Sequence, residues 1–366
     1  MLIKSVSILL VLITILSRHV MAQPAPPFSV VATTWNQDGT LISYIQDGKL
    51  RLVDASSGEV SSLPREFARN VNDAKWQSQG TKLAVATETG DVLIQDIRYE
   101  NGALMLIDTP ITLDYGVFPD IDNHLRGPDN LSWSYTGKYL AVSNSSGGGD
   151  YSLRIWNIET QMLILSASAG PGVRLAWSPV SNLLAVASSF GIRLVNVDQF
   201  ENGTENKLSY DSWQEIKSLA EGLESVGPAA WNATGTQIAL ADWYGKLWMV
   251  DVATGLATEL LNIQPNDMTN LFNITDLQWN RQRLYGAIAI SRYNETTRES
   301  RYESEVRVWD VSNAALLATY ESEAGFLYDI DIDASGQRLV FGTDAGSTRN
   351  ANLIDSGAVR IVDLTQ

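Results

Sequence analysis

Residues that could act as nucleophiles or as soft metal ligands are scarce in this chain. Its 366 residues include no cysteine and two histidines, His19 and His124. The lack of cysteine excludes thiol catalysis, thiolate metal sites and disulfides. Outside the N-terminal apolar segment, His124 is the one histidine that a serine triad could use, and no nucleophile-elbow sequence accompanies it. We therefore do not expect a hydrolase of the Ser-His-Asp type.

Carboxylates are the remaining chemical groups, and several gather between residues 114 and 130. Asp120 and Asp122 resemble the opening of a calcium-binding loop. Leu125 occupies the sixth loop position, where such loops need glycine, and Arg126 follows it. The segment is therefore interpreted as a polar loop, and no metal or cofactor is predicted. Two of these acids could still serve a glycosidase, which needs only a carboxylate pair.

A repeated sequence pattern decides where these groups must lie. An apolar residue is followed five positions later by tryptophan, and then by a polar turn that ends in or near glycine. The spacing between copies mostly exceeds the roughly 40–45 residues of a plain propeller blade, which indicates loop insertions. The tryptophans are Trp35, Trp76, Trp133, Trp177, Trp231 and Trp279, and a seventh copy has Ile332 in their place. The apolar residues are Val30, Val71, Val226, Ile274 and Leu327, with Pro128 and Gly172 in the two remaining copies.

A second pattern follows each copy of the first. Apolar and polar residues alternate and then reach Asp54, Asp96, Asn157, Asn196, Asp251, Asp310 or Asp363. Such alternation, in segments rich in Val, Ile, Leu and Trp, is typical of β-strands. Each unit is therefore predicted to run strand, tight turn, strand, hairpin, strand, and usually a fourth strand.

Seven ordered copies predict one all-β ring. A single unit cannot bury both faces of its sheet, whereas seven arranged radially pack on one another. We predict a single seven-bladed β-propeller of four-stranded antiparallel blades over residues 28–366. The tryptophans of the first pattern would then be core residues between blades. Three further tryptophans lie on predicted third strands and should also be structural: Trp156, Trp248 and Trp309.

The two patterns together resemble the WD-repeat family. A tryptophan with its turn is followed by a strand that ends in Trp-Asp, as at Trp309-Asp310, or in a variant of it. The resemblance covers nearly all of residues 28–366 and implies a degenerate family member that serves as a platform for binding. The chain departs from the family because only His124 could supply the histidine of the usual buried polar network. We expect apolar packing and strand ladders to hold the blades instead.

The last blade is expected to be incomplete. The sequence stops at Gln366, directly after the third strand of blade 7. Residues 23–27 read QPAPP, which is poor strand sequence because proline lacks a ladder donor. Blade 7 is therefore predicted to have three good strands and a weak or missing fourth.

Residues 209–226 allow two interpretations. Ser212 with Glu215 fits a helix capping box, yet the repeat register places residues 215–219 in the fourth strand of blade 4. We favour the strand, because tertiary context overrides local propensity. Trp213 and Trp243 lie outside the repeat register and are predicted to be exposed.

Three acids alternate along the predicted first strand of blade 7: Asp329, Asp331 and Asp333. Alternate residues of a strand share one face. Because no basic residue lies between them, we expect these carboxylates to line the water-filled channel of the ring.

The N-terminal segment resembles a secretory signal peptide. Lys4 precedes an apolar run over residues 6–16 that is too short to span a bilayer comfortably, and residues 20–22 give the small-residue spacing for cleavage. We expect cleavage after Ala22, a secreted or extracytoplasmic protein, and no stable membrane span after cleavage. An uncleaved N-terminal membrane anchor is the alternative. The predicted order is a signal peptide over 1–22, a short lead over 23–27 and the propeller over 28–366.

The chain is strongly acidic. It has 26 basic and 42 acidic residues, a formal charge of −16, and the leader holds Lys4 and Arg18 but no acid. Such a protein repels phosphate backbones, so nucleic acid is not an expected partner. The charge favours solubility, and we predict a monomer.

Loop lengths predict the working surface. Connections from the second to the third strand, and from blade to blade, open on one face of a propeller. The long connections of this chain belong to that class, at residues 108–130, 144–151, 262–272, 291–304 and 343–357. Loops longer than a fold needs are usually functional or disordered. The binding residues predicted on this face are Tyr115, Phe118, Asp120, Asp122, His124, Asp242, Trp243, Tyr244, Asp267 and Phe272.

Two functions remain in view. The first is a secreted scaffold, without enzyme activity, that binds a protein or extracellular ligand with aromatic anchors and orienting carboxylates. The second is a propeller hydrolase that cleaves a glycan with paired carboxylates. Carboxylates from different blades that converge within about 10 Å at the channel mouth, beside an exposed aromatic, would favour the second.

Overall fold

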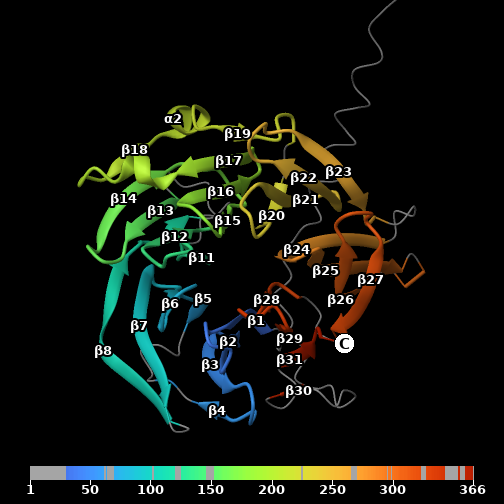
Figure 1. Cartoon of the computed structure of the whole chain (residues 1–366), viewed down its shortest axis with the longest axis horizontal. Coiled ribbons are helices and arrows are strands. Elements are labelled where there is room, and N and C mark those ends of the chain that lie inside the picture. Colours follow the sequence, from blue (N-terminus) through green and yellow to red (C-terminus); the bar gives the residue numbers. More distant parts are fainter. Residues whose placement is uncertain are drawn as a thin grey trace, which may run out of the picture.

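Seven β-sheets surround a common axis in the computed structural model of the protein (Figure 1). The predicted seven-bladed propeller is confirmed, and the sheets follow the chain in order around the ring. The structure describes residues 30–61, 63, 70–100, 103–119, 125–145, 152–223, 226–264, 270–294, 296–297, 299–322, 327–342, 353–354 and 359–365.

Blades 1 to 3 occupy the first half of the chain. Blade 1 contains β1 (Val30–Trp35), β2 (Leu41–Gln46), β3 (Lys49–Asp54) and β4 (Val60–Ser61). Blade 2 contains β5 (Val71–Trp76), β6 (Lys82–Thr87), β7 (Asp91–Glu100) and β8 (Ala103–Asp114). Blade 3 contains β11 (Asn130–Trp133), β12 (Tyr139–Ser143), β13 (Leu153–Asn157) and β14 (Met162–Ala167). A two-stranded ladder of β9 (Phe118–Pro119) and β10 (Leu125–Arg126) lies in the connection between blades 2 and 3.

Blades 4 to 7 complete the ring. Blade 4 contains β15 (Arg174–Trp177), β16 (Leu183–Ser188), β17 (Gly191–Asn196) and β19 (Ser218–Leu219). Blade 5 contains β20 (Val226–Trp231), β21 (Gln237–Asp242), β22 (Lys246–Asp251) and β23 (Ala257–Asn262). Blade 6 contains β24 (Asn270–Asn280), β25 (Arg283–Asn294), β26 (Glu299–Asp310) and β27 (Leu316–Ser322). Blade 7 contains β28 (Ile330–Ile332), β29 (Arg338–Gly342), β31 (Val359–Asp363) and β30 (Leu353–Ile354).

The repeated tryptophans pack between neighbouring blades, as predicted. Five of them are at most 8 % exposed, and Trp279 is half-buried. Three of these tryptophans also donate a hydrogen bond from indole Nε1 to a main-chain carbonyl of the preceding blade, at 2.9 Å. In each case the acceptor is the residue just before the repeated tryptophan of that preceding blade. These bonds therefore link consecutive blades without histidine. The pairs are Trp133 to Lys75, Trp177 to Ser132 and Trp231 to Ala176.

The acid or amide that ends most third strands closes the turn that follows. In blade 1, Asp54 Oδ1 accepts from the main-chain nitrogens of Ser56 and Ser57 at 2.9 and 2.7 Å. Asp310 accepts in the same way from Ser312 in blade 6. Hydrogen bonds from the serine hydroxyl and main chain hold the pKa of Asp54 and of Asp310 below the usual range. These acids of the second sequence pattern are therefore structural.

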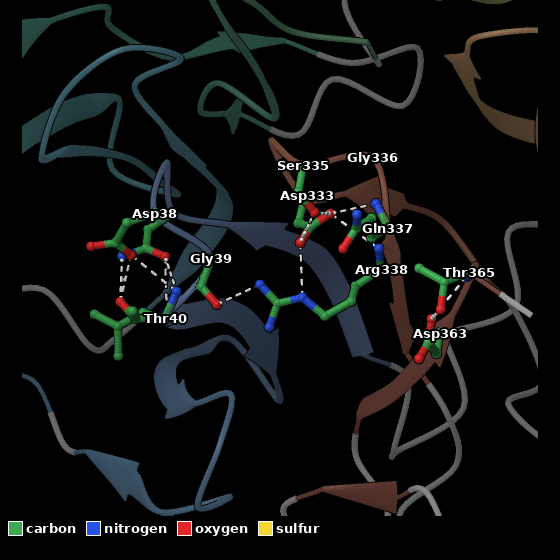
Figure 2. Close-up of polar contacts among 12 residues, drawn as sticks. Asp38, Gly39, Thr40, Asp333, Ser335, Gly336, Gln337, Arg338, Asp363 and Thr365 are labelled. Carbon is green, nitrogen blue, oxygen red and sulfur yellow. Dashed lines mark hydrogen bonds and ion pairs between the residues drawn. The ribbon is translucent and has the colours of Figure 1, made fainter.

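Blade 7 closes the ring against blade 1 through two polar links. Within the channel, Asp331 Oδ2 accepts from Thr34 Oγ1 at 2.9 Å and from the main-chain nitrogen of Trp35 at 2.8 Å. Near the short first-to-second turns, Arg338 Nη2 donates to the Gly39 carbonyl at 2.8 Å while Nε donates to Asp333 (Figure 2). The Arg338 guanidinium also lies 4.4 Å from the centre of the Trp35 ring. These side-chain contacts join blades 7 and 1, which are not consecutive in the chain. We call the boundary between these two blades the seam.

The outer part of blade 7 is short, as predicted. Three strands, β28, β29 and β31, form the blade, and the edge position holds only the two residues of β30. β30 comes from the connection before β31 and pairs with its first two residues, Val359 and Arg360. Residues 23–27, considered above for the missing strand, lie outside the described residues.

An insertion between β17 and β19 differs from the prediction. It contains a 3-10 turn (Val197–Phe200), β18 (Asn206–Leu208) and the helix α2 (Tyr210–Gln214). β18 runs parallel to β14 and adds a fifth strand to blade 3 (Figure 1). The favoured strand is present only at Ser218–Leu219, and Ser209, rather than Ser212, caps the helix.

The expected exposure of Trp213 is wrong. Its side chain is fully buried in the core shared by blades 3 and 4. The insertion folds back along the outer edge of blade 3, and the indole belongs to the same buried core as Ile164 of blade 3 and Val195 of blade 4. A residue outside the repeat register can therefore belong to the core, because the insertion supplies its own packing.

Candidate binding surface

The second-to-third turns and the blade-to-blade connections meet on one side of the ring, which we call the loop-rich face. Each of three connections is hydrogen-bonded to the second-to-third turn of the blade that it leaves, at 2.9 Å. The bonded pairs are Tyr115 with Gly90 in blade 2, Gly172 with Ser145 in blade 3 and Ile263 with Gly245 in blade 5. The opposite side carries the short first-to-second turns.

Exposed aromatic side chains are confined to the loop-rich face among the residues whose side chains the structure describes. All six that are more than 40 % exposed lie in second-to-third turns, at the ends of strands that lead to this face, or in the segments next to them. They are Phe190, Tyr210, Trp243, Tyr244, Tyr293 and Tyr328. Four belong to blades 4 and 5, and we call Phe190, Tyr210, Trp243 and Tyr244 the aromatic surface.

The aromatic surface is assembled from three segments of the chain. Phe190 and Tyr210 make an edge-to-face contact with ring centres 5.4 Å apart. The connection Gly170–Gly172 runs beside Phe190 and Trp243. A Cβ atom on Gly170 would lie 2.4 Å from the Phe190 ring, and one on Gly172 would lie 3.2 Å from Trp243. Both glycines also have positive φ, so larger residues there would be strained and would displace the rings.

The turn that carries Trp243 and Tyr244 is held by Asp242. One carboxylate oxygen accepts from the main-chain nitrogens of Tyr244 and Lys246 at 2.8 and 2.9 Å. The other accepts from Trp248 Nε1 at 3.0 Å. Asp242 is buried, so it positions the two aromatic residues rather than contacting a ligand itself as predicted.

Two other predicted binding residues are also core residues. Tyr115 is fully buried, donates its hydroxyl to the Ser152 carbonyl and packs near Trp156, and burial raises its pKa above the usual range. Phe272 is buried at the start of blade 6, beneath the Arg307 guanidinium. Loop position alone suggested exposure, but both residues lie where the strand ladder begins or ends and therefore pack inward.

The structure places the remaining predicted residues as follows. Trp243 and Tyr244 are exposed on the loop-rich face, as expected. Phe118 lies in β9 and pairs with Arg126 of β10. Asp120, Asp122, His124 and Asp267 lie outside the described residues.

Sequence reasoning missed Phe190 and Tyr210. Phe190 occupies the second-to-third turn of blade 4, the same place in the repeat as Trp243 and Tyr244 in blade 5. Alignment of these turns could have identified it. Tyr210 comes from the insertion, whose path to the loop-rich face follows only from the pairing of β18 with β14.

A channel of about 820 Å³ runs through the ring between the first strands of the blades. Trp243 and Tyr328 are among the residues that line it, together with Asp329 and Asp331 as predicted. Asp333 lies instead in the following turn, where it binds Arg338. A basic residue does neutralise part of this charge, because Lys75 of blade 2 forms an ion pair with Asp329.

Three channel carboxylates join adjacent blades. Each carboxylate accepts one hydrogen bond from the main-chain nitrogen of the residue that follows it. It accepts a second from a main-chain nitrogen in the first strand of the next blade, and the distances are 2.7–3.0 Å. The bridges run from Asp73 to Leu131, from Asp276 to Ile330 and from Asp331 to Trp35. Both oxygens of each group are therefore engaged in holding the ring.

The same carboxylates are hard to ionise. Burial raises the pKa of Asp73 to about 7 and that of Asp331 to about 6. Burial and the neighbouring Asp329 raise the pKa of Asp276 well above its usual range. Asp329, Asp73 and Asp276 in turn raise the pKa of Lys75 against the effect of its burial.

We expect thermal stability to fall as the pH rises from 5 to 8. The folded protein holds protons on Asp73 and Asp331 in this range that the unfolded chain has released, so the free energy of unfolding decreases with pH. The acids with lowered pKa, such as Asp54, affect stability only below about pH 4. Differential scanning fluorimetry should give a Tm at least about 2 °C lower at pH 8. Asp73→Asn should flatten this dependence, and a Tm that rises with pH would contradict the assignment.

Among the described residues, no group of three or more His, Asp or Glu side chains is arranged to hold a metal ion. None of the helices in the described segments is long and apolar enough to cross a membrane.

The seven blades define the class of protein, a seven-bladed β-propeller, here with exposed aromatic side chains on its loop-rich face. No family model matches the chain. It is 27 % identical over 177 residues to Minichromosome loss protein 1 of Schizosaccharomyces pombe, a match that covers 48 % of this chain and 19 % of that protein. It is also 27 % identical over 143 residues to Eukaryotic translation initiation factor 3 subunit I of Scheffersomyces stipitis, covering 37 % of this chain and 41 % of that protein.

Both relatives are WD-repeat-type proteins. The chain matches less than half the length of either one.

Proposed function

We propose that the protein is a scaffold that binds a protein partner through the aromatic surface. The observation that carries this proposal is the one-sided distribution of exposed aromatic side chains, four of which lie together on blades 4 and 5. Large aromatic residues dominate the energetics of protein interfaces. Exposed on one face of a soluble ring, they have no evident role in folding.

The contacts that hold the aromatic side chains in place also favour binding. Asp242 fixes the Trp243–Tyr244 turn with three hydrogen bonds, and Phe190 is held against Tyr210. A turn that is already ordered loses little conformational entropy when a partner binds. The side chains are thus presented in a preorganised arrangement.

Paired replacement of Trp243 and Tyr244 by alanine tests the proposal. The variant should bind its partner at least about 30-fold more weakly, because an aromatic hot spot contributes about 2 kcal/mol or more. Capture from the native extracellular fraction with wild-type protein, followed by titration of the captured partner, provides the measurement.

The matched control replaces two exposed leucines on the opposite side, Leu256→Ala with Leu316→Ala. It should bind as the wild type does once circular dichroism confirms folding. Equal binding by the control pair and the aromatic pair would remove the reason for placing the site on the loop-rich face.

Glycan hydrolysis is the second candidate function. One observation favours it, since carboxylates from blades 2, 6 and 7 converge on Lys75 in a channel that Trp243 and Tyr328 also line. Asp73, Asp276 and Asp331, however, use both oxygens to accept main-chain hydrogen bonds. A glycosidase needs one free carboxyl acid and one free carboxylate. The geometry therefore supports the scaffold better.

We also propose that the protein acts outside the cytoplasm as a monomer. The basic and apolar sequence of residues 1–22 supports export, with cleavage after Ala22. N-terminal sequencing of secreted protein should then begin at Gln23, whereas a start at Met1 in a membrane fraction would indicate an anchor.

A further inference from the structure

We propose that the segment bound on the aromatic surface is a basic peptide, one that carries lysine or arginine side chains. This inference rests on the proposed function and adds the chemistry of the partner. It follows from the charges that surround the four aromatic residues and from the attraction of their rings for cations.

Exposed carboxylates border the aromatic surface. Asp211 follows Tyr210 in the first turn of α2, and Glu215 lies at the C-terminal end of that helix. Glu221 belongs to the blade 4 to blade 5 connection, in a turn whose Leu223 carbonyl lies close to Gly191, next to Phe190. These three acids are available to pair with a partner's cations.

The described cations of this region already have partners within the protein. Lys207, three residues before Tyr210, forms an ion pair with Glu205 at 3.6 Å, and Lys217 donates to the Val252 carbonyl at 3.0 Å. Lys246 Nζ lies 2.8 Å from the Glu259 carboxylate and over the Trp248 ring. Arg193 donates to the carbonyls of Gln214 and Ile216. Arg174 lines the channel, where it interacts with Asp129. The exposed charge around the aromatic surface is therefore negative.

The channel beside Trp243 does not oppose this charge. Its lysine, Lys75, forms an ion pair with Asp329 and lies among the carboxyl groups of Asp73, Asp276 and Asp331. The exposed acids around the aromatic surface therefore attract cations and repel an acidic partner. Exposed indole and phenol faces also attract lysine and arginine directly by cation–π interaction. Aromatic and electrostatic recognition thus select the same class of ligand.

Selection from a library of random dodecapeptides displayed on phage tests the inference. We expect peptides enriched on the wild-type protein to contain lysine or arginine beside apolar residues. Synthetic fluorescein-labelled copies should bind at least about 30-fold more weakly to the Trp243→Ala, Tyr244→Ala variant. They should bind about threefold more weakly to Asp211→Asn with Glu221→Gln. Binding should weaken further as the ionic strength rises from about 50 to about 200 mM.

The charge control is Asp108→Asn with Glu159→Gln. The structure places Asp108 in the middle of β8, rather than in the connection predicted from residue 108 onward, and Glu159 in the turn between β13 and β14 on the opposite side. Removing these two exposed carboxylates should leave binding unchanged. Asparagine tolerates the positive φ of Asp108. Peptides that depend on Trp243 and Tyr244 but lack basic residues would overturn this inference and leave the proposed function standing. Peptides that bind the aromatic variant as well as the wild type, or the absence of any enrichment, would overturn both.

Discussion

Replacing Asp331 by alanine is expected to destabilise the ring more than any other change of a single polar side chain. The carboxylate accepts hydrogen bonds from Thr34 Oγ1 and from the main-chain nitrogens of Trp35 and Ile332. Its removal leaves three donors without their acceptor at the seam between blades 7 and 1. Since each unsatisfied buried donor costs about 1–3 kcal/mol, the free energy of unfolding should fall by about 3 kcal/mol or more.

Asp73→Ala is the matched comparison, because Asp73 makes the equivalent bridge between blades 2 and 3. Those blades follow one another in the chain, so the loss of one bridge should cost less there than at the seam. Glu159→Ala, at an exposed residue, should change little. Thermal and urea unfolding followed by tryptophan fluorescence would measure all three. A loss for Asp331→Ala no larger than that for Glu159→Ala would show that the seam does not depend on this carboxylate.

Trp213→Ala is expected to have the second large effect. The side chain is fully buried in the core between blades 3 and 4, with Leu208 and Ile216 of the insertion packed against that core. Truncation of a buried tryptophan typically costs about 3–5 kcal/mol. Because the lost contacts anchor the insertion, residues 197–217 should also become sensitive to limited proteolysis.

Trp213→Phe provides the control for this prediction. The Trp213 Nε1 atom has no protein acceptor among the described residues, so phenylalanine removes no hydrogen bond while it keeps most of the apolar volume. It should cost much less than alanine and leave the insertion resistant to protease. Equal losses for the two variants would indicate that the insertion depends on something other than this packing.

The ring could be predicted from the sequence because its core repeats. A tryptophan recurs in six of the copies and packs between blades, and the acid or amide after most third strands closes the turn that follows. Trp213 has no counterpart in other blades, so neither its burial nor the path of the insertion could be read from a repeat. The carboxylate bridges could not be predicted from the sequence either, because Asp73 and Asp276 reach their hydrogen-bond donors only after adjacent blades have packed together.

The candidate site was predictable only in part. Trp243 and Tyr244 lie at the tip of a tight turn between two well-marked strands, where side chains project outward. Tyr115 was assigned to the same face, but main-chain pairing with Gly90 draws it against the second-to-third turn and turns its ring into the core. Whether an aromatic residue in a connection points outward depends on such hydrogen bonds, which no pattern of residue types reveals.

The fifth strand of blade 3 has a consequence for intermolecular strand pairing. Unpaired outer strands are sites where a second molecule can add and begin aggregation. β18 covers the outer edge of β14, and the outermost strands of blades 1, 4 and 7 are only two residues long. Blades 2, 5 and 6 instead end in β8, β23 and β27, which have six or more residues. Aggregation of partly unfolded protein should therefore start from these three blades.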